Sequence, residues 1–143
     1  MAATATRTAQ RTIHPVHAVL LASILPLFFG ALLSDWAYSS TKVVQWINFA
    51  AWLVSGGLVL AGLTLAWAAI DYLRADRVRD RSSMVYVAVL LGTCILGLID
   101  ALLHAKDAWA TMPAGLMLSI LLTLVALAAV WLGFSTLRTG GAR

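Results

Sequence analysis

Four apolar stretches, each long enough to cross a lipid bilayer, limit what this chain can fold into. They cover residues 16–33, 43–70, 84–103 and 112–137. A hydrocarbon core about 30 Å thick needs about 20 helical residues, at a rise of about 1.5 Å per residue. Because backbone polar groups in lipid must be satisfied within the segment, we expect all four stretches to be helices. The sequence therefore predicts an all-α, polytopic membrane protein with a four-transmembrane-helix bundle.

Composition and length support one membrane domain. Charged residues make up 11% of the chain and hydrophobic residues 62%, whereas soluble domains carry about 25% charged residues. No alternation of apolar and polar residues is sustained, which argues against a membrane β-barrel. The predicted transmembrane domain covers residues 14–138, between tails of residues 1–13 and 139–143, with helices over residues 15–37, 44–72, 83–105 and 112–137.

The basic residues predict the orientation in the membrane. Eight of the ten Lys and Arg residues lie in the two tails and the second connection, and only Lys42 and Lys106 lie in the other two connections. Basic residues concentrate on the cytoplasmic side, so we expect a multi-pass protein of the bacterial inner membrane with both termini cytoplasmic. The net charge of +4 then reflects topology and contact with anionic lipids, and not binding to nucleic acid.

Ionisable residues at the inner edge of the bundle form one candidate functional group. His14 and His17 are three residues apart where the first helix begins, so they lie on nearly one helix face. Asp71 lies at the end of the second helix, on the same side of the membrane. Neighbouring helices could bring Asp71 to a histidine, where a carboxylate would fix the imidazole tautomer. The alternative is that these groups only cap helices and form interfacial hydrogen bonds.

The outer edge carries a second candidate group. Asp100 and His104 are four residues apart and therefore share a helix face. Asp100 lies about one turn inside the apolar third helix, where an acid is costly and usually faces the bundle interior or a cavity. The predicted functional or docking edge consists of Asp35, Asp100, His104, Asp107 and Trp109. A local salt bridge or hydrogen bond within this group is the alternative.

A haem group is hard to place in one chain with these histidines. His14 and His17 lie at one side of the membrane and His104 at the other, about 30 Å away. Two axial nitrogens must sit about 4 Å apart across one iron. No cofactor is therefore predicted. Haem b, with ligands drawn from the three histidines, would need a methionine ligand, a symmetric dimer or a partner protein.

Signatures of an enzyme or a transporter are missing from the sequence. There is no His-Glu-x-x-His, no Gly-x-Ser-x-Gly, no phosphate-binding loop and no glutamate. The midplane polar groups are only Ser55, Thr64, Thr93 and Cys94. Small residues in the second and third helices favour close helix packing within the chain, with a homodimer contact as the alternative. We interpret the protein as non-enzymatic, with the lipid bilayer as its surroundings.

Three segments carry a resemblance to a known family. The start Arg11-Thr-Ile-His14-Pro15-Val-His17 resembles the His-Pro-x-His opening of a bacterial family of four-helix integral membrane proteins of unknown function. The run from Gly62 to Asp71-Tyr72 is similar to the end of its second helix. The run from Gly97 to Trp109 resembles small proteobacterial-type members. The chain departs from the many members that read His-Pro-x-His-Pro with a further histidine, because Ala18 follows His17.

The resemblance implies a role near electron transfer, because some relatives are fused to, or encoded beside, redox modules. On this basis we predict an accessory or anchoring subunit of a membrane or periplasmic redox enzyme. One alternative is a haem- or quinone-binding membrane electron carrier. The other is a purely structural membrane protein that only packs against lipid or other helices.

Overall fold

The structure, a computed structural model, describes residues 13–74, 81–106 and 108–137, without the side chains of Trp109, Thr136 and Leu137. Within this part the ordered elements are all helical, and four helices are long and apolar enough to cross a membrane. The predicted all-α membrane fold is therefore confirmed. The elements are α1 (Pro15–Thr41), α2 (Val44–Leu73), α3 (Arg81–His104), α4 (Ala108–Thr111) and α5 (Ala114–Leu137).

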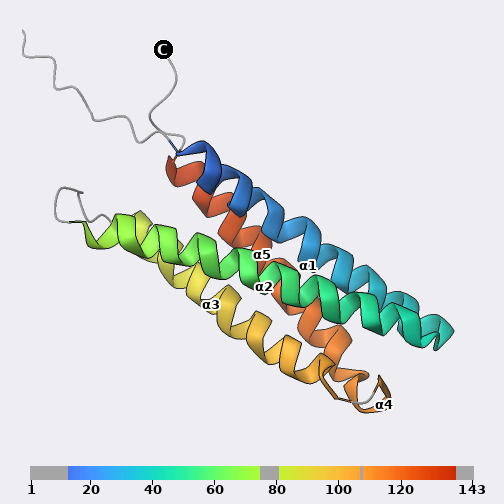
Figure 1. Cartoon of the computed structure of the whole chain (residues 1–143). Coiled ribbons are helices and arrows are strands. Elements are labelled where there is room, and N and C mark those ends of the chain that lie inside the picture. The colour runs from blue at the N-terminus through green and yellow to red at the C-terminus, as the bar shows by residue number, and fades with distance from the viewer. Residues whose placement is uncertain (1–12, 75–80, 107, 138–143) are drawn as a thin grey trace, which may run out of the picture.

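The four long helices form an elongated up-and-down bundle, with the short α4 at one end (Figure 1). Helix α1 packs against α2 and α5, and α3 packs against the same two helices. It follows that α1 and α3 lie across the diagonal of the bundle. We call the end where α1 begins and α5 finishes the His17 end, and the end where α1 passes to α2 the Asp35 end.

Residues at the helix termini explain where α1 begins and ends. The Nδ1 atom of His14 accepts a hydrogen bond from the backbone N–H of Val16, and Pro15 occupies the first helical position, where its missing N–H costs little. At the other terminus Lys42 adopts the left-handed conformation and donates its N–H to the carbonyl of Tyr38, a common way to end a helix. Helix α1 therefore ends four residues beyond residue 37.

The ends of α2 and α3 differ from the sequence-based ranges by one residue, and two helix starts differ by two residues. Helix α3 begins at Arg81, two residues before residue 83. Helix α5 begins at Ala114, after a cis peptide bond between Met112 and Pro113, and α4 forms a separate turn before it. Because proline lacks an N–H, it suits the start of a helix and not its interior. The predicted tails lie outside the described residues, except for Ile13.

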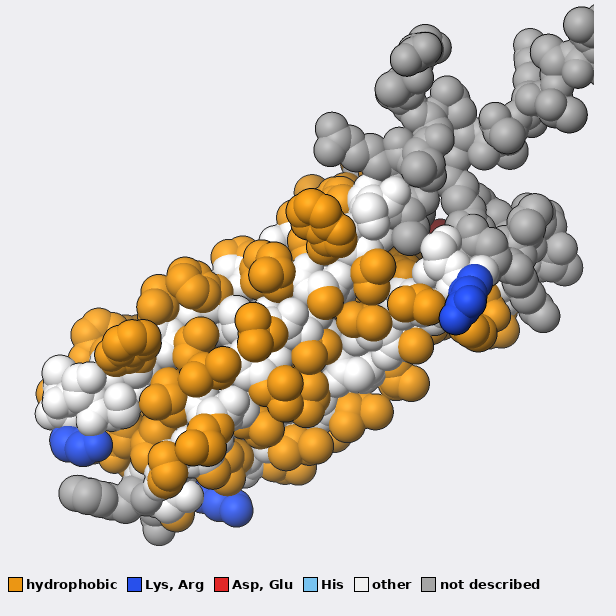
Figure 2. Space-filling view, turned by 180° about the vertical axis from the view of Figure 1, so that it is seen from behind, with side chains coloured by type: hydrophobic (Ala, Val, Ile, Leu, Met, Phe, Trp, Pro, Cys, Tyr) orange, Lys and Arg blue, Asp and Glu red, His pale blue; other side chains and the backbone are white. Residues whose placement is uncertain are grey.

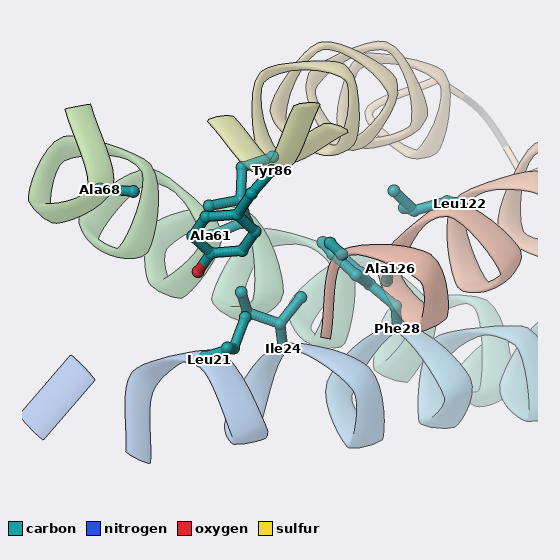
Figure 3. Packing of buried hydrophobic residues seen from close by; sticks show 10 residues of the cluster. Leu21, Ile24, Phe28, Ala61, Ala68, Tyr86, Leu122 and Ala126 are labelled. Atoms are coloured by element: carbon teal, nitrogen blue, oxygen red, sulfur yellow. The ribbon is translucent and has the colours of Figure 1, made fainter. Parts of the chain in front are cut away.

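Apolar packing fills the centre of the bundle between the two ends. Leu21, Ile24 and Phe28 of α1 point toward Tyr86 of α3 and Leu122 of α5 (Figure 3), and all five side chains are buried. A Cβ atom on Gly57 would lie 2.6 Å from the Phe28 ring, and one on Gly133 would overlap with the side chain of Leu21. Small residues therefore let α2 and α5 approach α1 closely, as membrane helices commonly do.

The outside of the bundle is apolar along its length. Figure 2 shows hydrophobic side chains over most of one face, with Lys and Arg side chains at the two ends. Trp52 is 78% exposed and Trp131 is 74% exposed. Such a continuous apolar exterior would be unfavourable in water, and it matches a lipid-facing surface.

Candidate functional site

Four buried polar side chains meet at the Asp35 end. Asp35 comes from α1, Asp100 and His104 from α3, and Ser119 from α5. Both carboxylates have no exposed surface, and His104 and Ser119 are 8% and 1% exposed. We call these four residues the Asp35 cluster. Ionisable groups inside a membrane bundle are costly, so their presence marks a candidate functional site.

Both ring nitrogens of His104 are held by hydrogen bonds. Its Nδ1 atom lies 2.9 Å from the backbone carbonyl oxygen of Asp100, one turn earlier in α3. A carbonyl oxygen only accepts, so Nδ1 carries a hydrogen and donates it. Its Nε2 atom lies 2.9 Å from Oδ1 of Asp35. The imidazole therefore connects the backbone of α3 to the carboxylate of α1 across the bundle.

Ser119 completes the cluster between the two carboxylates. Its Oγ atom makes a short hydrogen bond to Oδ2 of Asp35 and lies 3.2 Å from Oδ2 of Asp100. The other oxygen of Asp100, Oδ1, is buried and has no hydrogen-bond partner. It lies 3.2 Å from Nδ1 of His104, but the hydrogen of that nitrogen is directed to the Asp100 carbonyl. Three helices are thus linked by one polar network.

Small and hydroxylated residues surround the Asp35 cluster. Thr123 Oγ1 donates to the carbonyl of Ser119 at 2.7 Å, with the carbonyl of Phe28 at 3.2 Å. Thr111 of α4 is buried and lies 3.3 Å from the carbonyl of Leu103. A Cβ atom on Gly115 would lie 2.8 Å from Thr111 and 3.5 Å from His104. The backbone of α5 therefore approaches the imidazole closely.

A pocket lies beside the cluster at the same end of the bundle. Its volume is about 320 Å³, and its lining includes Tyr38, Lys42, Met112, Pro113 and Leu116. Tyr38 follows Asp35 by three residues on α1, and Leu116 precedes Ser119 by three on α5. Residues three apart in a helix are one turn apart. The pocket is therefore about one helical turn from the buried carboxylates.

The His17 end carries a smaller polar contact. His17 Nε2 lies 3.0 Å from the hydroxyl of Tyr86, which reaches across the bundle from α3. The rings of His14 and His17 both lie against Trp67, with centroids 5.1 and 6.0 Å away. Among the described residues no hydrogen bond joins the carboxylate of Asp71 to either histidine. Among the described residues, the hydrogen-bond partner of His17 is thus Tyr86.

The structure brings together three of the five residues predicted for the outer edge. Asp35, Asp100 and His104 form one network, whereas Asp107 and the Trp109 side chain lie outside the described residues. The side chains of these three are buried, so they form an interior site, and of the predicted functional or docking edge the functional role stays a prediction.

Ser119 was missed by the sequence analysis. A usable signal was present, because Ser119 and Thr123 are four residues apart, with apolar residues elsewhere in residues 114–134, and so share one face of α5.

His104 lies too far from His14 and His17 to share one iron atom with either of them within a chain. His17 and Asp35, the partner of His104, are 18 residues apart on α1, which is about 27 Å along a helix. Within the described ranges, no group of three His, Cys, Asp or Glu side chains is arranged to hold a metal ion. Haem binding thus has no paired-histidine site in the described part of one bundle.

Four apolar spanning helices around a polar interior cluster define a polytopic membrane protein. Over residues 13–141 the chain matches the family model described as predicted membrane protein (DUF2231), and it belongs to that family. This assignment confirms the resemblance to a four-helix membrane family of unknown function. Comparisons with curated proteins and with solved structures give no significant match.

Proposed function

We propose that the protein is an accessory or anchoring subunit of the bacterial inner membrane, associated with a membrane or periplasmic redox enzyme. The observation that carries this proposal is that hydrogen bonds between buried side chains join the helices in the interior of the bundle. Asp35, His104 and Ser119 join three helices through buried side chains that already bind one another. Because these polar groups already bind one another, they are better suited to hold the helices together than to bind a substrate.

The exterior supports association with another membrane protein. Gly62 of α2 and Gly92 of α3 lie on adjacent helices, and a Cβ atom on either would meet nothing within 4 Å. Glycines on the outside of a membrane helix permit close approach of a second helix. We therefore place the partner against the α2–α3 face. The redox character of that partner rests on the sequence resemblance described above.

Photo-crosslinking in native membranes tests the partner and its position. A photoreactive amino acid is placed at Leu63 or Leu91, each about half exposed and beside one of the two glycines. The matched controls are Val19 of α1 and Trp131 of α5, which are exposed on the other helices. We expect crosslinks to a subunit of one redox enzyme from Leu63 and Leu91, and none from the controls.

A functional measurement accompanies the crosslinking. Membrane vesicles from cells lacking the protein should lose part of their substrate-driven oxygen consumption, and the wild-type gene should restore it. Crosslinks only to lipid or only to a second copy of the chain, together with unchanged respiration, would contradict the proposal. A crosslink only to a second copy would instead support the homodimer alternative.

A further inference from the structure

We propose that the Asp35 cluster is a proton-binding site, in which Asp100 holds one proton beyond those that Ser119 and His104 supply. The site lies between α1, α3 and α5 at the Asp35 end of the bundle. This inference is independent of any partner enzyme, because it concerns the purified chain alone.

Counting hydrogens in the cluster leads to this proposal. A serine hydroxyl has one hydrogen, and its Oγ faces Oδ2 of Asp35 at the shorter distance and Oδ2 of Asp100 at 3.2 Å. When that hydrogen goes to Asp35, no donor from Ser119 remains for Asp100. A protonated Asp100 resolves the contact, because its O–H donates to Oγ of Ser119, which in turn donates to Asp35.

The unpartnered oxygen of Asp100 agrees with this assignment. Oδ1 of Asp100 is buried and accepts no hydrogen bond. If Asp100 were ionised, its Oδ2 would lack a donor, and its Oδ1 would have only Nδ1 of His104 at 3.2 Å, whose hydrogen is directed to the Asp100 carbonyl, which is costly for a buried charge. In a protonated acid, Oδ1 is a neutral carbonyl oxygen, and leaving one such acceptor unpaired costs far less.

Charge balance points in the same direction. With His104 protonated on both nitrogens, Asp35 ionised and Asp100 protonated, the cluster is neutral. Loss of the Asp100 proton would leave one net negative charge inside an apolar bundle, which is unfavourable in a low-dielectric interior.

The charged groups around the cluster offer no nearby alternative. Helices α4 and α5 contribute no ionisable side chain among the described residues, and those of α2, Asp71 and Tyr72, lie at the His17 end. Tyr38 is buried one turn away on α1, while Lys42 and Lys106 are exposed. The pocket beside Tyr38 and Leu116 lies about one helical turn from the carboxylates, at the same end of the bundle.

Infrared difference spectroscopy of the purified, detergent-solubilised full chain tests the proposal. A protonated carboxylic acid has a C=O stretching band that is separate from carboxylate bands and shifts when H₂O is replaced by D₂O. We expect this band in the wild type and in the control Asp71→Asn, and its loss in Asp100→Asn. The asparagine amide can donate to Ser119 as the protonated acid does, so Asp100→Asn should keep its fold.

A second variant keeps the test decisive if Asp100→Asn fails to fold. In Ser119→Ala the acceptor of the Asp100 hydrogen is removed, so the band should persist and move to higher frequency. Absence of the band from the wild type at neutral pH would overturn the proposal, and so would a band that survives in Asp100→Asn or does not move in Ser119→Ala.

Discussion

At the scale of single residues, the cluster depends on how hydrogen bonds compensate for burying charge. His104 donates from Nδ1 to a backbone carbonyl of its own helix, which fixes the ring so that Nε2 faces Asp35. Asp35 accepts contacts on both of its oxygens, one from α3 and one from α5. Asp35 is therefore the residue through which the three helices are linked, and its removal affects two partners at once.

We predict that Asp35→Ala destabilises the bundle by about 1–3 kcal/mol, the cost of leaving buried partners unsatisfied. His104 can lose a proton when its counter-charge is removed, so the loss reflects hydrogen bonds and not a persistent buried cation. Thermal unfolding in detergent measures the change. Ser55→Ala is the matched control, because Ser55 is exposed and bonds only within α2. Equal unfolding temperatures for the two variants would contradict the prediction.

The same residues show what could be predicted from sequence. The spacing of Asp100 and His104 placed them on one helix face, and the position of Asp100 inside an apolar span indicated that it faces the interior. Their contact with Asp35, 69 residues from His104, depends on which helices lie across the diagonal. No local pattern determines that arrangement. The contact of Ser119 with both carboxylates required the same knowledge, although its spacing from Thr123 already indicated a polar face on α5.

At the scale of helices, close approach depends on a few glycines, and only some of those in the sequence take part. Gly57 lies directly against the buried Phe28 ring, whereas Gly62, five residues later on α2, meets nothing within 4 Å. The sequence indicated small residues along this helix without telling which of them face a neighbour. Only the three-dimensional arrangement of the helices shows which glycines contact a neighbouring helix.

Gly57→Ala should destabilise the bundle by about 1–3 kcal/mol, as overpacking of a filled interior typically does. The new Cβ atom would lie 2.6 Å from Cε1 of Phe28, which has no exposed surface and cannot move freely. Gly62→Ala is the control and should leave stability nearly unchanged in detergent. The unfolding midpoints of both variants in a denaturing detergent titration give the comparison. A Gly57→Ala variant as stable as the control would show that the ring can shift.

At the scale of the whole molecule, two polar contacts join the diagonal helices α1 and α3 near opposite ends of the bundle. His17 with Tyr86, and Asp35 with His104, are each 69 residues apart in sequence. Between them lies the apolar centre formed around Leu21, Ile24 and Phe28 (Figure 3). The two ends therefore differ in chemistry, with paired acids and a histidine at one end and a histidine–tyrosine contact at the other.

The basic residues predict which end faces the cytoplasm, and a matched pair of serines tests this prediction. Ser82 lies at the His17 end and Ser40 at the Asp35 end, and both are exposed. A membrane-impermeant maleimide should label Ser40→Cys in spheroplasts, and Ser82→Cys only after permeabilisation. The wild type is the control, because Cys94 lies within α3. The reverse labelling pattern would place the Asp35 cluster and its pocket at the cytoplasmic face, so its proton would exchange with the cytoplasm instead of the periplasm.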